Sequence, residues 1–251
     1  MDEEQGYAGV CNICGTKCRF VRGDARSSRE AFACTGCRAV LRYRDQAALI
    51  VDEFARGRSI FLRNMVNQGM LSEIDIYEPA MHGPFVNALK ALPRYVRSYY
   101  WPDRPTGSVD ADGVRCEDLT ALTFPDDSFD LVITSDVMEH IYDIRSAFAE
   151  ITRVLKPGGI HVFSIPNDWP FPEHSEPRVE IVDGEERHLK PARYHTAGDG
   201  TPCIVYHDYG SDLLDMIDAT GCRTLAVRRH AAFDPAYVNA TFVTRKLGRA
   251  R

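Results

Sequence analysis

The sequence predicts a doubly wound, mostly parallel α/β sheet that follows a small cysteine-rich N-terminal module. Five of the eight cysteines fall within the first 37 residues. From about residue 72, short runs rich in β-branched and aromatic residues alternate with stretches of helical periodicity. Sheets of this class bind their ligands at the carboxyl ends of the strands, so we expect the functional residues there.

The composition of the chain excludes several classes of protein. Its 251 residues are 44% hydrophobic and 26% charged, which suits a packed core and excludes a disordered, collagen-like or disulfide-stapled chain. No apolar run approaches the roughly 18 residues of a membrane span, and the acidic N-terminus lacks the apolar stretch of a signal peptide. The net charge of −6 argues against a nucleic-acid footprint over the whole protein. We therefore expect a soluble cytoplasmic protein without a membrane partner.

Two Cys-x-x-Cys pairs, separated by nineteen residues, define the N-terminal module. They are Cys11 with Cys14, and Cys34 with Cys37. Each pair can direct two thiolates to one point, and four thiolates form the closed tetrahedral shell of structural zinc. Cys18 lies at a longer offset and is expected to stand outside the site. Disulfides are not expected, because nothing in the sequence signals export.

The module is also basic between its cysteines. Residues 11–44 hold two acidic residues, Asp24 and Glu30, against eight basic ones. This excess could meet RNA phosphates or an acidic small molecule, or it could be a solvated face that pairs with the acidic remainder of the chain. The basic residues are Lys17, Arg19, Arg22, Arg26, Arg29, Arg38, Arg42 and Arg44.

The elements expected along the chain divide it into three parts. Residues 1–44 form the zinc module, and residues 45–70, with apolar positions at helical spacing, form a helical linker. The third part, 71–251, carries helices over 143–155 and 209–220, with Pro157-Gly158-Gly159 ending the first. The least regular stretch, about 166–207, is expected to be a loop or lid inserted in this part. Strands are expected at 74–77, 95–100, 114–116, 129–134, 160–165, 225–229 and 237–244.

Three motifs in this third part resemble a known family. Residues 122–132 read LTFPDDSFDLV, Glu139-His140 follows, and residues 153–159 read RVLKPGG. In this order and at these intervals they are similar to the class I S-adenosylmethionine-dependent methyltransferases of type 11, over roughly residues 72–170. The resemblance implies a Rossmann-like, seven-stranded sheet, S-adenosylmethionine as cofactor and methyl transfer as the reaction.

The resemblance also implies positions for cofactor-binding residues. Glu78 stands where the family has an acidic residue after its first strand, but of the three usual glycines in the following turn only Gly83 is present. The second strand normally ends in a carboxylate that binds the ribose, whereas this chain has Tyr99 there and no carboxylate before Asp103. Either the cofactor binds by an altered route, or the domain has lost catalysis.

The third and fourth strand ends match the family more closely. Asp118 corresponds to the aspartate that accepts a hydrogen bond from the adenine amine, with Leu119 beside it to cover the ring. Ser135 and Asp136 follow the fourth strand, where the resemblance implies that sulfonium and acceptor meet.

Methyl transfer requires a positioned nucleophile and, for some acceptors, a proton acceptor. The candidates for this role are Asp136, His140 and, from the lid region, His195 and His207. His140 could instead only brace the next helix. The lid histidines could be ordinary surface residues or ligands of a second metal ion.

Three functions are compatible with these observations. The overall acidity and the aromatic, histidine-bearing lid favour a methyltransferase that acts on oxygen or nitrogen of a small-molecule acceptor, such as a sugar or secondary metabolite, in biosynthesis. The basic zinc module favours instead an rRNA-modifying methyltransferase. The reduced glycine turn favours a non-catalytic binding protein with this fold.

Overall fold

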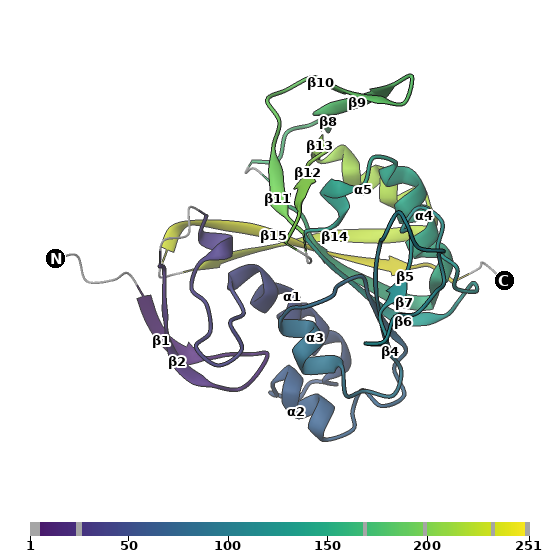
Figure 1. The fold of residues 1–251 in the computed structure, drawn as a ribbon. Coiled ribbons are helices and arrows are strands. Elements are labelled where there is room, and N and C mark those ends of the chain that lie inside the picture. The colour runs from purple at the N-terminus through teal and green to yellow at the C-terminus, as the bar shows by residue number, and fades with distance from the viewer. Residues whose placement is uncertain (1–5, 24–26, 168–169, 198–199, 232–233, 249–251) are drawn as a thin grey trace.

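The computed structural model describes residues 6–23, 27–167, 170–197, 200–231 and 234–248. Its centre is a seven-stranded sheet with the order β14-β15-β7-β6-β3-β4-β5 (Figure 1). The strands from β5 to β7 are parallel, and the hairpin β14–β15 joins β7 in antiparallel orientation. The order reverses between β3 and β6, which makes this a doubly wound sheet with a topological switch point and confirms the predicted fold class.

All seven predicted strands are present with small shifts at their ends. The clearest difference is β7, which starts directly after helix α4 (Ile144–Val154), so that Pro157-Gly158-Gly159 lies inside the strand rather than after the helix. A Cβ on Gly159 would lie 2.9 Å from the carbonyl oxygen of Phe129, and glycine permits this close approach of the two strands. The strands are β3 (Ile76–Glu78), β4 (Tyr95–Tyr99), β5 (Arg115–Cys116), β6 (Phe129–Ser135), β7 (Leu155–Ser164), β14 (Cys222–Ala231) and β15 (Asp234–Lys246).

The two faces of the sheet are covered by two hydrophobic clusters. Alternate residues of β6 divide between them, since Leu131 and Ile133 belong to one cluster and Val132 to the other. Helices α4 and α5 (Asp212–Asp218) pack on the second cluster. The first cluster is covered by α1 (Leu41–Phe54), α2 (Leu62–Asn67) and α3 (Pro84–Leu89). No described helix combines the length and apolar character needed to traverse a lipid bilayer.

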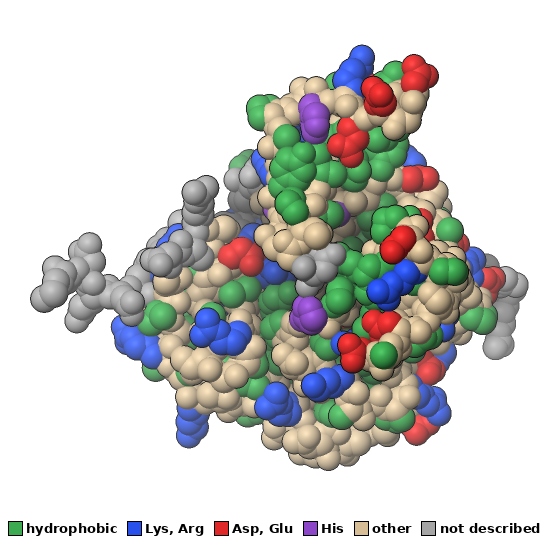
Figure 2. All heavy atoms as spheres, viewed as in Figure 1, with side chains coloured by type: hydrophobic (Ala, Val, Ile, Leu, Met, Phe, Trp, Pro, Cys, Tyr) green, Lys and Arg blue, Asp and Glu red, His purple; other side chains and the backbone are tan. Residues whose placement is uncertain are grey.

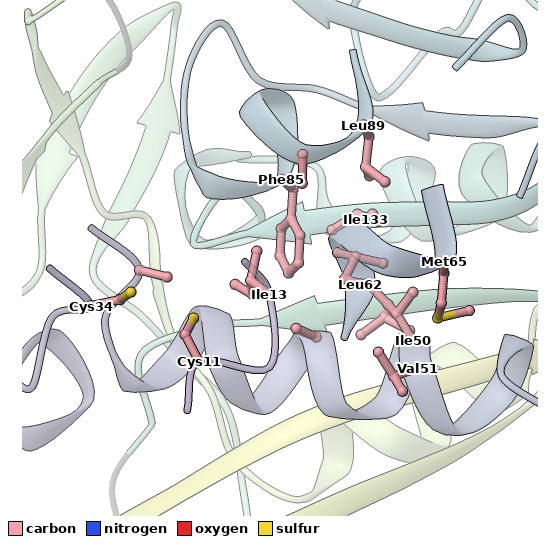
Figure 3. Close-up of a cluster of buried hydrophobic side chains, with 14 of the residues drawn as sticks. Cys11, Ile13, Cys34, Ile50, Val51, Leu62, Met65, Phe85, Leu89 and Ile133 are labelled. Atoms are coloured by element: carbon pink, nitrogen blue, oxygen red, sulfur yellow. The ribbon is translucent and has the colours of Figure 1, made fainter. Parts of the chain in front are cut away.

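The N-terminal module shares its core with the sheet. It consists of the antiparallel hairpin of β1 (Gly6–Val10) and β2 (Lys17–Val21), the 3-10 helix η1 (Ser28–Glu30) and the loops that carry the cysteines. Figure 3 shows Cys11, Ile13 and Cys34 beside side chains of α1, α2 and α3, all in one buried cluster. The boundary proposed at residues 44/45 falls inside α1, so the cysteine module packs continuously onto the larger part.

Residues 166–207, expected to be a loop or lid, contain three small antiparallel strand pairs. β8 (Glu176–Pro177) pairs with β13 (His207–Asp208), β9 (Val179–Val182) with β10 (Glu185–His188), and β11 (Tyr194–Thr196) with β12 (Pro202–Ile204). These strands have two to four residues, and β10 is exposed throughout, so no alternation of apolar and polar residues marks them in the sequence. The pairs project from the body of the molecule as a separate ridge, which we call the lid (Figures 1 and 2).

Candidate functional site

A cavity of about 1130 Å³ lies where the strands of the parallel sheet end. Its walls include residues that follow β3, β4, β5, β6 and β7, in agreement with the place where doubly wound sheets bind ligands. The N-terminal module closes one side with Arg29 and Arg42, and the lid closes another with His195 and Tyr206. We call it the carboxyl-edge cavity. Of the predicted cofactor residues, Glu78, Tyr99, Asp118, Leu119 and Ser135 line it.

Glu78 ends β3 at the floor of this cavity. Its side chain is buried, and burial raises the pKa of its carboxyl to about 8, although the Tyr95 hydroxyl donates a hydrogen bond of 2.6 Å to it. Gly83 lies five residues on, just before α3, with a φ of 136° that a residue with a side chain rarely adopts. Gly83 itself is not among the lining residues, whereas residues 79–82 of the turn are.

The predicted adenine region lies after β4 and β5. Asp118 accepts hydrogen bonds at Oδ1 from the backbone N–H and the hydroxyl of Thr120, at 2.8 and 2.7 Å, and these bonds orient its carboxylate. Leu119 is buried against the second core cluster and contributes an apolar surface beside it. Tyr99, at the end of β4, makes an edge contact with Trp101, with ring centroids 5.1 Å apart. Asp103 is exposed and lies outside the cavity lining.

Asp136 forms an ion pair that sequence reasoning did not anticipate. Its two carboxylate oxygens each accept a hydrogen bond of 2.8 Å from Arg29, and Arg42 Nε lies 3.2 Å away. Burial alone would raise the pKa of Asp136, but the two guanidinium groups outweigh it and hold the pKa well below the usual range. A carboxylate held in this way is a poor proton acceptor. Its neighbour Ser135 donates a hydrogen bond to Gln46 of α1.

Within the described part of the chain, Arg42 keeps one donor without a hydrogen-bond partner. Its Nε donates to Glu30 at 2.6 Å, and its guanidinium lies over the Tyr43 ring, but Nη1 is buried with no hydrogen-bond partner among the described residues. Arg42 lines the cavity, so its positive charge would favour an anionic group that enters there. The sequence does not indicate that Arg29 and Arg42 lie beside Asp136, because the two arginines are about a hundred residues from it in the chain.

His140 and His195, predicted separately as bases, meet on the lid side of the cavity. Nδ1 of His195 lies 3.2 Å from Nε2 of His140, and the two rings are nearly perpendicular. Both nitrogens face the side chain of Glu139, which is buried, and burial raises the pKa of its carboxyl. Glu139 was part of the recognised motif but had not been considered as a site residue. His207 lies further away and bonds to the Tyr142 carbonyl instead.

The four predicted zinc ligands come together in the N-terminal module. The sulfurs of Cys11, Cys14, Cys34 and Cys37 all lie within 4.8 Å of one another, with Cys11–Cys37 at 3.7 Å and Cys14–Cys34 at 3.6 Å. Four sulfurs bound at about 2.3 Å to one tetrahedral ion lie about 3.8 Å apart, so the separations of 3.6 and 3.7 Å match a zinc site, and the other pairs, all within 4.8 Å, need at most a small shift. Cys18 is not part of this group.

Fewer basic side chains are exposed on the module than its sequence contains. Arg29 and Arg42 line the cavity and pair with Asp136, and Arg44 is buried, where it donates to the Tyr7 hydroxyl and to the Phe32 carbonyl. Arg22 also donates to the Ser28 hydroxyl, so at least four of the eight basic side chains serve internal contacts. Lys17, Arg19 and Arg38 are exposed, while Arg26 lies outside the described residues.

Part of the chain is similar in sequence to known proteins. Residues 96–163 match the family described as a methyltransferase domain. A probable S-adenosylmethionine-dependent methyltransferase of Mycolicibacterium smegmatis is 34% identical over 83 residues, which is 33% of this chain and 28% of that protein. The sterol 24-C-methyltransferase of Aspergillus fumigatus is 33% identical over 109 residues, 41% of this chain and 28% of that protein. These alignments span less than a third of either relative.

Solved methyltransferase structures are similar over a larger part of the chain at low identity. A sugar N-methyltransferase from Streptoalloteichus has 16% identity and a TM-score of 0.48, covering 78% of this chain and 92% of that one. The fold is a doubly wound α/β domain whose cavity lies at the switch point, where sheets of this class bind ligands. The family match and the relatives make the comparison more specific: residues 96–163 are similar to a methyltransferase domain, and one relative that aligns with part of this chain is a probable S-adenosylmethionine-dependent methyltransferase.

Proposed function

We propose that this chain transfers a methyl group from S-adenosylmethionine to a compact small-molecule acceptor within the carboxyl-edge cavity. The observation that carries the proposal is the position of Glu78, Tyr99 and Asp118 at three successive strand ends of a methyltransferase domain, all lining one cavity. Pockets for a single drug-sized ligand measure about 300–1,000 Å³. The volume of about 1130 Å³ is therefore large enough for a nucleoside cofactor together with a small acceptor.

The lining residues suit the parts of this cofactor. The cofactor supplies the methyl group on its sulfonium. Asp118, with Oδ1 engaged by Thr120, would present Oδ2 to the adenine amine, and Leu119 would cover the ring. Arg42, which lines the cavity, would contact the carboxylate of the methionine part through its guanidinium group. This contact could replace some of the binding that a glycine-rich turn provides in the family.

The acceptor would lie under the lid, between Asp136 and His195. Here the chain's own residues orient the nucleophile and exclude water, which is the main contribution an enzyme can make to an in-line displacement. The buried Glu139 together with His140 and His195, which are partly exposed, supports an active enzyme rather than a binding protein. The inward arginines leave less positive charge on the module for RNA, which favours the small-molecule acceptor.

Calorimetric titration with S-adenosylmethionine tests the proposal. The wild-type chain should bind one equivalent, and Asp118→Ala should weaken binding by about 1–3 kcal/mol, or roughly 5- to 150-fold. Asp103→Ala is the matched control, because this exposed aspartate lies outside the cavity and its loss should leave the affinity unchanged. Equal affinity of wild type and Asp118→Ala would contradict the placement of the nucleoside.

We also infer that Cys11, Cys14, Cys34 and Cys37 hold a structural zinc ion. The sulfur separations and the N–H of Gly36, which donates to Cys34 Sγ at 3.3 Å, support the inference, since thiolates in such sites commonly accept backbone N–H bonds. Cys34→Ser should lower the zinc content by about one equivalent and destabilise the module, because metal binding is coupled to folding. Cys18→Ser should do neither. Unchanged zinc content in Cys34→Ser would refute the inference.

A further inference from the structure

The cluster of Glu139, His140 and His195 brings three metal-binding side chains to one point of the cavity wall. Glu139 and His140 belong to the 3-10 helix η2 (Met138–His140), which follows β6, and His195 belongs to β11 of the lid. Three possible ligand atoms, one from each of these side chains, form a small triangle. His195 Nδ1 lies 3.2 Å from His140 Nε2 and 3.3 Å from Glu139 Oε1, and His140 Nε2 lies 3.7 Å from the same oxygen.

These separations match those of ligands on one metal ion. Nitrogen and oxygen ligands bound at about 2.0–2.1 Å to a tetrahedral ion lie about 3.4 Å from one another. An ion at the centre of this triangle therefore needs almost no movement of the three side chains. Two imidazoles and one carboxylate, with a further position open, form a donor set of catalytic zinc sites. Magnesium would favour more oxygen ligands.

The lid fixes which nitrogen of His140 can act as a ligand. His140 Nδ1 lies 2.6 Å from the carbonyl oxygen of Ile204, in β12. A carbonyl only accepts hydrogen bonds, so Nδ1 must carry the proton and Nε2, which faces the triangle, presents its lone pair. Metal-binding histidines commonly donate their other N–H to such a carbonyl. The hairpin β11–β12 thus supplies one ligand, His195, and orients another.

The Glu139 carboxylate gives an independent reason for a cation. The residue is 1% exposed, and neither of its carboxylate oxygens has a hydrogen-bond partner among the described residues; the two imidazoles of the triangle pair with it only when they are protonated. A buried carboxylate without partners is strongly destabilising, so such groups are paired or coordinate metals. The nearby guanidinium groups of Arg29 and Arg42 are engaged by Asp136 and Glu30. A metal ion at the triangle would supply the missing partner.

We propose that Glu139, His140 and His195 bind a divalent transition-metal ion, with zinc as the best fit, whose open coordination positions face the carboxyl-edge cavity. This site is separate from the four-cysteine site, from which it differs in ligands and in its place in the fold. Both imidazoles then serve as ligands rather than as proton acceptors.

Binding of the ion does not depend on the proposed methyl transfer, but the role that we assign to the ion does. An acceptor hydroxyl bound to the ion has a lowered pKa and loses its proton to water at the cavity mouth. Its oxygen then forms a bond to the methyl carbon of S-adenosylmethionine while the carbon–sulfur bond breaks. The electron pair of that bond goes to sulfur, which yields the methyl ether and S-adenosylhomocysteine. The acceptor class is therefore an alcohol or phenol, with vicinal hydroxyls best suited to chelate the ion.

Zinc titration by calorimetry on the full chain tests the site. The chain is first dialysed until about one tightly held zinc ion remains, at the four-cysteine site. The wild type should bind one further equivalent of Zn²⁺, and millimolar Mg²⁺ should not compete. Glu139→Gln and His195→Ala should each lose this second equivalent while keeping the first. His188→Ala is the matched control, since this exposed lid histidine lies outside the triangle and should keep both.

His195→Ala keeps the test decisive if Glu139→Gln fails to fold, because His195 is on the lid and its side chain is one-third exposed. Absence of a second equivalent in the wild type, or equal binding by wild type and His195→Ala, would overturn the proposal. Binding of S-adenosylhomocysteine is measured on the same samples. A chain that binds the nucleoside but no second metal refutes only the metal site, and one that binds the metal but no nucleoside refutes only the proposed methyl transfer.

Discussion

Replacement of Asp136 by asparagine should destabilise the whole chain, because the side chain neutralises two buried arginines. Arg29 and Asp136 are 11% and 13% exposed, and their bidentate contact joins the N-terminal module to the end of β6. Removing one partner of a buried ion pair costs about 3–5 kcal/mol, since the remaining charge stays buried. Glu30 lies 2.6 Å from Arg42 and 3.5 Å from Arg29, and it still compensates part of the charge. We therefore expect the free energy of unfolding to fall by about 3 kcal/mol, the lower end of this range.

Urea unfolding followed by circular dichroism measures this loss. For a chain of this size, with a slope of about 3 kcal/mol per molar urea, the midpoint should fall by about 1 M. Asp126→Asn is the matched control: Asp126 also pairs with an arginine, but it is 68% exposed, and such pairs contribute less than about 1 kcal/mol. The double variant Arg29→Met, Asp136→Leu should lose less than the two single changes together.

A midpoint for Asp136→Asn close to that of Asp126→Asn would refute this reasoning. It would mean that water reaches the arginines in the native state, so that no buried charge is left behind. The assignment of Asp136 as an anchor, and not as a proton acceptor, would then lose its physical basis.

Three further predictions concern stability. Burial raises the pKa of Glu78 from 4.5 to about 8, so between these pH values the folded state holds a proton that the unfolded chain has lost. Stability should therefore fall as the pH rises through this window. In Glu78→Gln, the free energy of unfolding should depend less on pH over the same range. Burial lowers the pKa of His161 from 6.5 to about 3, so stability should fall as the pH drops through that range. His161→Gln should reduce this pH dependence of stability, measured by thermal unfolding. The same slope of stability against pH in the variant and the wild type would contradict the prediction. Gly159→Ala should cost about 1–3 kcal/mol in urea unfolding, because its Cβ would meet two backbone oxygens at 2.9 Å, while an unchanged midpoint would show that the strands can separate there.

The features that the sequence could predict depend on local patterns. The seven strands and the helix over 143–155 follow from hydrophobic periodicity, and the four-cysteine cluster follows from its spacing. Strand ends of one parallel sheet meet at one edge, and for this reason Glu78, Tyr99 and Asp118 could be expected to share a cavity.

The features that it could not predict depend on contacts between distant segments. The pairing of Arg29 with Asp136 joins residues 107 positions apart, and no periodicity marks it. The meeting of His195 with His140 depends on how the lid folds back, which its two- to four-residue strands do not encode in any alternation. Glu139 stood within a recognised motif, but only its burial without partners distinguishes it from a solvated acid.

A crystal structure of the chain with S-adenosylhomocysteine tests the central claim most directly. We predict one nucleoside in the carboxyl-edge cavity, with its adenine amine at Asp118, its carboxylate near Arg42 and its sulfur toward the space below His140. A nucleoside bound elsewhere, or a cavity that stays free of it at saturating concentration, would contradict the account.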